Sequence, residues 1–184
     1  MLRLKEKYKN EVAKKLQEKF GYKNKAAVPF VEKVVVNSGF GKAVAGKDSS
    51  ERKKIIDNIM NSLSLITGQK PSLRKARKSI SSFKLRKGLP IGAKVTLRGQ
   101  RMYDFMEKLI LLVLPRVRDF RGIEPGKVDK NGNLTIGFRE SMPFPELSFE
   151  KEKSIFSLEV TVVTKAKTRE EALALLRLLG FPIK

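Results

Sequence analysis

The 184-residue chain contains no cysteine and no histidine. The lack of cysteine excludes disulfides and thiolate metal sites, and the lack of histidine removes the side chain that most often exchanges protons near neutral pH. Tryptophan is absent and tyrosine occurs only three times, so few rings are available for stacking on splayed bases. These absences exclude most familiar enzyme mechanisms, and we expect no metal and no other cofactor.

Long hydrophobic runs are also missing. The longest purely aliphatic run, residues 109–114, is far too short to cross a bilayer, and the N-terminal MLRLKEKYKNE has no signal-peptide core. We therefore expect a cytoplasmic protein with no membrane partner. Hydrophobic residues make up 41% of the chain and fall in periodic segments, which predicts a folded core rather than a disordered basic tail. The length fits a single domain over residues 1–184.

The most informative absence is that of acidic residues from positions 58–103. This acid-free window holds eleven Lys or Arg side chains and supplies about half of the formal net charge of +21. Ten of these cations lie between Thr67 and Gly99. Charged surfaces usually mix both signs, so this density of uncompensated positive charge predicts an anionic partner, nucleic acid above all, rather than a merely solvated face.

Two short alternating runs inside the window predict a hairpin. Residues 93–98 alternate between apolar and polar side chains, which is typical of a strand with one buried face. Lys94, Thr96 and Arg98 then share its polar face. Residues 83–86 alternate in the same way, and the Gly and Pro residues of 88–92 supply a turn between the runs. We expect a basic hairpin with a mobile loop near 77–92.

Apolar periodicity predicts the other elements. We expect helices over 2–20, 48–66, 102–115 and 168–179, strands near 31–37, 134–138 and 158–162, and a long mobile connection over 139–153. The order favours an α+β fold, with a single mostly antiparallel sheet, helices packed on one face and the basic hairpin loop protruding. The other face is left for a partner, and strand parity lets Lys33 and Asn37 join it.

The segment GKAVAGKD, residues 41–48, nearly matches a phosphate-binding loop and lies between a predicted strand and a predicted helix. Its last position argues against nucleotide binding, because Asp48 stands where the motif needs a Ser or Thr hydroxyl for magnesium. Asp48 and Glu51 instead suit a capping box for the following helix, so we interpret the segment as a flexible turn. No small-molecule substrate is expected.

Three neutral polar residues, Asn37, Gln69 and Thr96, stand among the cations. Amide and hydroxyl groups can hydrogen-bond base edges and ribose hydroxyls. The plainer alternative is that these residues only satisfy turns and strand ends. Because aromatic residues are few, recognition of the shape and backbone of a folded RNA fits better than base stacking.

Five segments together resemble one protein family: VEKVVVNSGFGKA (31–43), TGQKPSLRKARKSISSFKLRKGLPIGAKVTLRG (67–99), RMYDFMEKL (101–109), PRVRDFRGI (115–123) and GNLTIGFRE (132–140). They are similar, in order and over essentially the whole chain, to the bacterial large-subunit ribosomal protein number five, the universal uL-five family. The resemblance implies a non-catalytic protein that binds 5S rRNA and attaches it in the central protuberance. It also implies contacts with 23S rRNA, with the elbow of P-site tRNA through the basic hairpin loop, and with a small-subunit head protein at an intersubunit bridge.

The resemblance also implies site residues. Those associated with the 5S rRNA surface are Lys33, Asn37, Gln69, Lys70, Lys94, Thr96 and Arg98. Those implied to contact tRNA or 23S rRNA are Arg74, Lys75, Arg77, Lys78, Ser79, Ser81, Ser82, Lys84, Arg86 and Lys87. The chain departs from the family pattern at Ser38, at Phe40 and at residues 141–143.

Rival functions make different predictions. An RNA-cleaving or RNA-modifying enzyme needs paired carboxylates or a metal site, whereas most acids here lie within Lys-rich helices. A cationic membrane-surface protein predicts vesicle binding that survives excess RNA, and a general DNA-binding protein predicts a preference for duplex DNA. The remaining alternative is a general structured-RNA-binding protein outside the ribosome.

Overall fold

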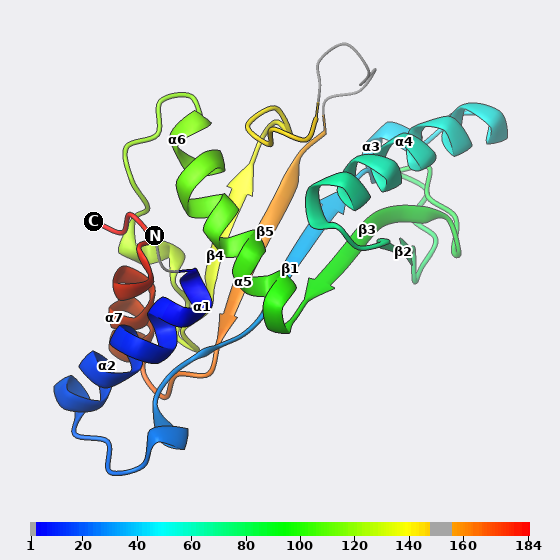
Figure 1. The fold of residues 1–184 in the computed structure, drawn as a ribbon. Coiled ribbons are helices and arrows are strands. Elements are labelled where there is room, and N and C mark those ends of the chain that lie inside the picture. Colours follow the sequence, from blue (N-terminus) through cyan, green and yellow to red (C-terminus); the bar gives the residue numbers. More distant parts are fainter. Residues whose placement is uncertain (1–2, 148–155) are drawn as a thin grey trace. The chain divides into compact units, whose positions relative to one another are not determined.

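The computed structural model describes residues 3–147 and 156–184 (Figure 1). In this part of the chain the strands are β1 (Val31–Gly39), β2 (Ser72–Lys75), β3 (Pro90–Leu97), β4 (Leu134–Phe138) and β5 (Leu158–Thr164). They form one open sheet in the order β2-β3-β1-β5-β4, and neighbouring strands run antiparallel. The predicted α+β class with one mostly antiparallel sheet is confirmed.

The first helical segment runs without a break from residue 4 to residue 20. It comprises α1 (Leu4–Lys7), a π-helical turn (Tyr8–Val12) and α2 (Ala13–Phe20). Leu4, Val12 and Leu16 are buried, as the spacing of four residues predicts. Gly21 ends the helix with a positive φ of 68°, a conformation that glycine adopts without strain.

The other helices follow the predicted order. They are α3 (Gly41–Val44), α4 (Ser49–Thr67), α5 (Gly99–Lys108), a π-helical turn (Leu109–Val113), α6 (Leu114–Arg116) and α7 (Arg169–Leu179), with 3-10 turns at Lys25–Ala27 and Pro125–Lys127. The C-terminal helix is capped as its sequence predicts, because Thr168 Oγ1 accepts a hydrogen bond of 3.3 Å from the Glu171 amide. The Glu171 carboxylate in turn accepts from the Lys167 amide at 2.8 Å.

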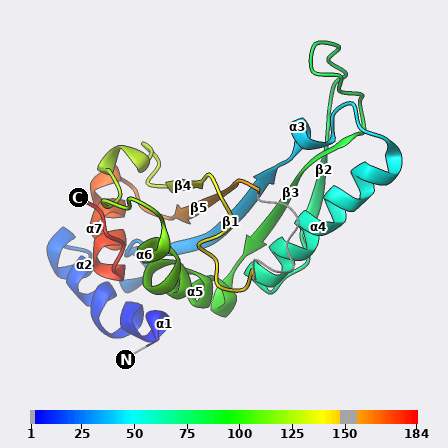
Figure 2. The same cartoon turned by 90° about the horizontal axis from the view of Figure 1, so that it is seen from above.

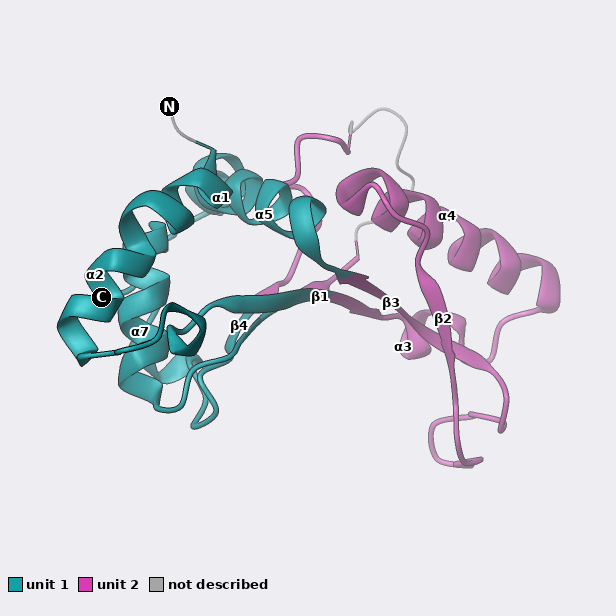
Figure 3. Cartoon of the chain, turned by 60° about the horizontal axis from the view of Figure 1, so that its bottom comes forward, with its two compact units in different colours: residues 1–35, 97–136, 161–184 teal, residues 36–96, 137–160 magenta. Residues whose placement is uncertain are grey.

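The chain divides into two compact units (Figure 3). Unit 1 comprises residues 1–35, 97–136 and 161–184, and unit 2 comprises residues 36–96 and 137–160. Unit 1 buries Leu16, Leu109 and Leu175 completely, and unit 2 has a core of its own that includes Leu63 and Phe144. One RNA-binding domain over residues 1–184 stays a prediction.

In unit 2, α4 lies alongside β2 and β3 (Figures 2 and 3). Its buried side chains include Ile59, Leu63 and Ile66, and β3 buries Ala93, Val95 and Leu97. The alternation predicted for residues 93–98 is therefore confirmed. Lys94 and Thr96, the residues between them, are half-buried on the other face of the strand.

The first arm of the predicted hairpin is wrong. The partner of β3 is β2, with Ser72 opposite Lys94 and Lys75 opposite Pro90, and residues 83–86 lie in the connection between the two strands. The alternation of 83–86 finds no core to face, since Phe83 is 62% exposed. Residues 90–92, assigned to the loop, belong to β3.

The segment 41–48 is not the simple turn that its sequence suggested. Gly41–Val44 forms α3, because Phe40 and Val44 are buried at its two ends and the Phe40 amide donates to the Ile91 carbonyl at 2.9 Å. The predicted capping box is also wrong: Asp48 occupies the N-cap of α4, but its side chain accepts no hydrogen bond from the first turn of this described helix. The mobility predicted near 77–92 and 139–153 stays a prediction, and residues 148–153 of the second range lie outside the described residues.

Candidate nucleic-acid interface

Residues 76–89, which we call the basic loop, connect β2 to β3 and extend beyond the ends of both strands (Figure 2). Main-chain hydrogen bonds hold this loop together. At its base, the Ala76 amide donates to Leu89 and the Gly88 amide donates to Ala76, at 2.8 and 2.9 Å. Further out, Ile80 and Leu85 exchange two bonds of 3.0 and 3.1 Å. The loop is therefore a narrow second hairpin that closes over residues 81–84.

Side chains and one strained residue complete this small hairpin. Ser79 Oγ accepts a hydrogen bond of 2.9 Å from the Lys87 amide. Lys84 has a positive φ of 51° at the closing turn, a conformation that a lysine adopts only where the surrounding structure requires it. The backbone thus gives the loop cations defined starting points, although their side chains are exposed.

The basic loop is free of negative charge in space as well as in sequence. Its five cations are Arg77, Lys78, Lys84, Arg86 and Lys87. Among the described residues, none of the five has a carboxylate oxygen within 4.0 Å. Because no internal anion neutralises them, these cations are available to phosphate groups.

Sequence reasoning missed Phe83 as a candidate binding residue. The alternation of residues 83–86 assigned it to a core, whereas its ring stands at the closing turn and Ile80 nearby is also exposed. An exposed aromatic ring among cations is suited to stacking on a nucleic-acid base. The signal was present in the sequence, because Ser82 and Lys84 flank the ring inside the acid-free window.

A second group of candidate residues lies on the strands of unit 2. Asn37 is exposed on β1, between the buried Val36 and Ser38. Gln69 follows α4, and its side-chain amide donates to the Thr96 carbonyl oxygen at 3.3 Å. The structure therefore brings together two of the three neutral residues that the sequence singled out.

The other predicted residues are dispersed. In unit 2, Lys70 is exposed directly after Gln69, and Arg74 and Lys75 are exposed on β2. In unit 1, Lys33 forms an ion pair of 3.3 Å with Glu32, which competes with any phosphate. Arg98 is exposed at the N-cap of α5.

The described residues offer neither a metal centre nor a membrane span. No group of three or more Asp or Glu side chains among them is arranged to hold a metal ion. No helix in the same part of the chain has the length and apolar character needed to span a membrane.

Comparison with known proteins identifies the family. The model described as "Ribosomal protein L5" matches residues 24–86, and the model described as the C-terminus of this ribosomal family matches residues 90–183. The large ribosomal subunit protein uL5 of Halothermothrix orenii is 51% identical, over 97% of each chain. The uL5 proteins of Rubrobacter xylanophilus and Syntrophomonas wolfei are 50% and 52% identical, over 100% of this chain and 99% and 100% of their own. The chain belongs to the ribosomal protein L5 family.

Proposed function

We propose that this protein is a non-catalytic constituent of the large ribosomal subunit in the cytoplasm, where it binds 5S rRNA and attaches it in the central protuberance. The relatives are large ribosomal subunit proteins by name, which supports the general role. The observation that carries the RNA-binding part is the acid-free window, whose loop cations have no carboxylate neighbour among the described residues. Such a surface gains most from a polyanion, because each neutralised phosphate releases condensed counterions.

The 5S rRNA surface is proposed on the polar sides of the strands. Asn37, Lys94 and Thr96 belong to it in unit 2, where packing of the opposite strand faces fixes their direction. The Gln69 amide is held by the Thr96 carbonyl, which leaves its own carbonyl oxygen to accept from a ribose hydroxyl. The further proposed contacts are Lys70 in unit 2 and Lys33 and Arg98 in unit 1.

The basic loop is proposed for other RNA contacts. Together with Arg74 and Lys75 it would bind 23S rRNA and the elbow of P-site tRNA, and its hydrogen-bonded backbone supports this by limiting the entropy lost on binding. The family resemblance further suggests contact with a small-subunit head protein at an intersubunit bridge, to which we assign no residues.

Replacing Asn37 or Thr96 tests the 5S rRNA surface. Asn37→Ala and Thr96→Ala should each weaken binding to 5S rRNA about tenfold more than binding to an unrelated folded RNA, since a base or ribose partner is left unpaired. Asn58→Ala, which removes an exposed amide from α4 in the same unit, should change neither affinity. Equal losses on both RNAs would show that these residues do not discriminate, as expected of a general structured-RNA-binding protein outside the ribosome.

A further inference from the structure

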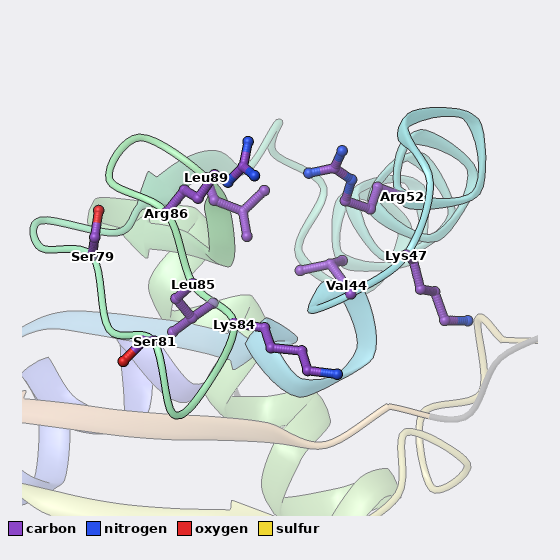
Figure 4. A pocket seen from close by; sticks show the side chains of 10 residues that line it. Val44, Lys47, Arg52, Ser79, Ser81, Lys84, Leu85, Arg86 and Leu89 are labelled. Carbon is purple, nitrogen blue, oxygen red and sulfur yellow. The ribbon is translucent and has the colours of Figure 1, made fainter.

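A cavity of about 720 Å³ lies in unit 2 between the basic loop and the connection from α3 to α4 (Figure 4). Lys47 and Arg52 line it on one side, and Lys84 and Arg86 line it from the loop. Ser79 and Ser81 add two hydroxyl groups. No Asp or Glu is among the described residues that line the cavity.

The charges of the cavity call for an anion. None of its four cations has a carboxylate oxygen within 4.0 Å in the part of the chain that the structure describes. In Figure 4 the guanidinium groups of Arg52 and Arg86 turn toward the same gap between α4 and the basic loop. Two like charges that face one gap repel each other, and a phosphate between them would convert this repulsion into attraction.

Arg52 is anchored in a way that suits this role. Its Nε donates to the Asp48 carbonyl oxygen at 3.4 Å, which holds the side chain against the first turn of α4. The two outer nitrogens of the planar guanidinium remain to make paired hydrogen bonds to phosphate oxygens.

One wall of the cavity is apolar. Val44 is fully buried, and Leu85 and Leu89 are half-buried. The volume lies within the range of roughly 300–1,000 Å³ that is typical of small-ligand sites and exceeds what one phosphate group needs. Charged groups beside an apolar wall match a ligand that joins a phosphate to a flat base.

The near match to a phosphate-binding loop contributes directly to this cavity. Gly46 and Lys47 of the GKAVAGKD segment line it. Gly46 has a φ of 74°, and a Cβ atom at this position would lie 3.8 Å from Lys84 Cδ, so the segment and the basic loop approach closely here. Asp48 is not a lining residue, and any binding would proceed without a magnesium site of the usual motif.

We propose that this cavity is a nucleotide-binding site that needs no metal, with the phosphate held between Arg52 and Arg86 and the base against Val44, Leu85 and Leu89. The shared chemistry is a nucleoside carrying a phosphate, and its source is either a free nucleotide or an unstacked nucleotide of a bound RNA. The proposal does not rest on 5S rRNA binding.

The first experiment contains no RNA. The full chain, freed of nucleic acid in high salt and returned to low salt with EDTA, is titrated with GMP in a calorimeter, and ribose 5-phosphate is the probe without a base. A free source predicts saturable one-site binding of GMP, tighter than that of ribose 5-phosphate. The double variant R52Q/R86Q should lose at least tenfold in affinity, and R52K/R86K should lose part of it, because lysine keeps the charge but not the fork.

A matched control separates the site from general charge. Lys53 is exposed next to Arg52 on α4, and Arg77 is exposed in the basic loop; neither lines the cavity. K53Q/R77Q removes the same charge and should leave GMP binding unchanged. Because the chain carries all its RNA surfaces in this assay but no RNA, a negative result does not bear on the 5S rRNA proposal.

The second experiment tests the RNA source. RNA containing 4-thiouridine is crosslinked to the protein by light, and the attached peptide is identified by mass spectrometry. If GMP does not bind, a crosslink to residues 85–89 that is lost in R52Q/R86Q and kept in K53Q/R77Q supports an RNA nucleotide as occupant. The proposal is overturned if neither GMP nor RNA occupies the cavity, or if the control variant loses as much as the pocket variant.

Discussion

β3 and the basic loop belong to the same acid-free window but hold their cations by different means. β3 buries Ala93, Val95 and Leu97, so packing decides the direction of Lys94 and Thr96. In the basic loop, residues 77–84 are exposed, and main-chain hydrogen bonds such as the pair between Ile80 and Leu85 decide the shape. One surface is an outgrowth of the core, whereas the other is a self-contained hairpin.

This difference separates stability from binding. A change on the buried side of β3 alters the core and the RNA surface together. A change at the tip of the basic loop removes little buried area, so it can alter binding while the folded state keeps its free energy of unfolding. The two regions can therefore be tested independently.

The largest expected effect comes from matched truncations of leucine in the two regions. Leu97→Ala should lower the free energy of unfolding by about 2–5 kcal/mol, because it empties a fully buried site in β3. Leu85→Ala in the basic loop should cost about 1 kcal/mol or less, since this side chain is only half-buried. Urea unfolding of both variants measures the contrast, and similar losses would refute the idea that the loop is independent of the core.

Removing the exposed ring of the basic loop should affect binding alone. Phe83→Ala is expected to weaken binding to tRNA by about 1–3 kcal/mol, the usual contribution of a ring stacked on a base, and to leave the midpoint of urea unfolding unchanged. Fluorescence anisotropy with labelled tRNA measures the affinity. Phe83→Leu keeps apolar area without a ring and should bind as weakly as the alanine variant, so full binding by the leucine variant would rule out stacking.

The smallest expected effect is the response of RNA affinity to pH. The chain has no histidine and the acid-free window has no carboxylate, so no side chain with an ordinary pKa in this range belongs to the proposed surfaces. Affinity for 5S rRNA should therefore stay constant from about pH 6 to about pH 8 at fixed salt. A change of tenfold or more would show that a titrating group outside the window controls binding.

The sequence predicted most of the fold because most elements carry a long periodic pattern. The first helix, α4 and α7 show their apolar stripes over several turns, and β3 shows its alternation over a run that faces the core. The runs 83–86 and 93–98 look alike in sequence, yet only the second has buried partners opposite it. That distinction depends on tertiary packing, which four residues cannot reveal.

Two further features could not be predicted for related reasons. β2 is an edge strand whose four side chains are all exposed, and charged edges of this kind carry no apolar alternation. The cavity joins Gly46 and Lys47 to Lys84 and Arg86, nearly forty positions apart in the sequence. The acid-free window itself, by contrast, was readable at once, because charge composition needs no fold to be seen.

The central claim is that specific RNA recognition is added to the electrostatic attraction of the window. It is tested most directly by a filter-binding titration of 5S rRNA against a length-matched structured RNA at several salt concentrations. If about six cations neutralise phosphates, the logarithm of affinity should fall against the logarithm of salt with a slope of roughly −4 to −5. We predict that 5S rRNA binds at least about a hundredfold more tightly than the control and that this preference persists as salt rises. Equal affinities with one shared steep slope would contradict the account, because charge density alone would then explain the binding.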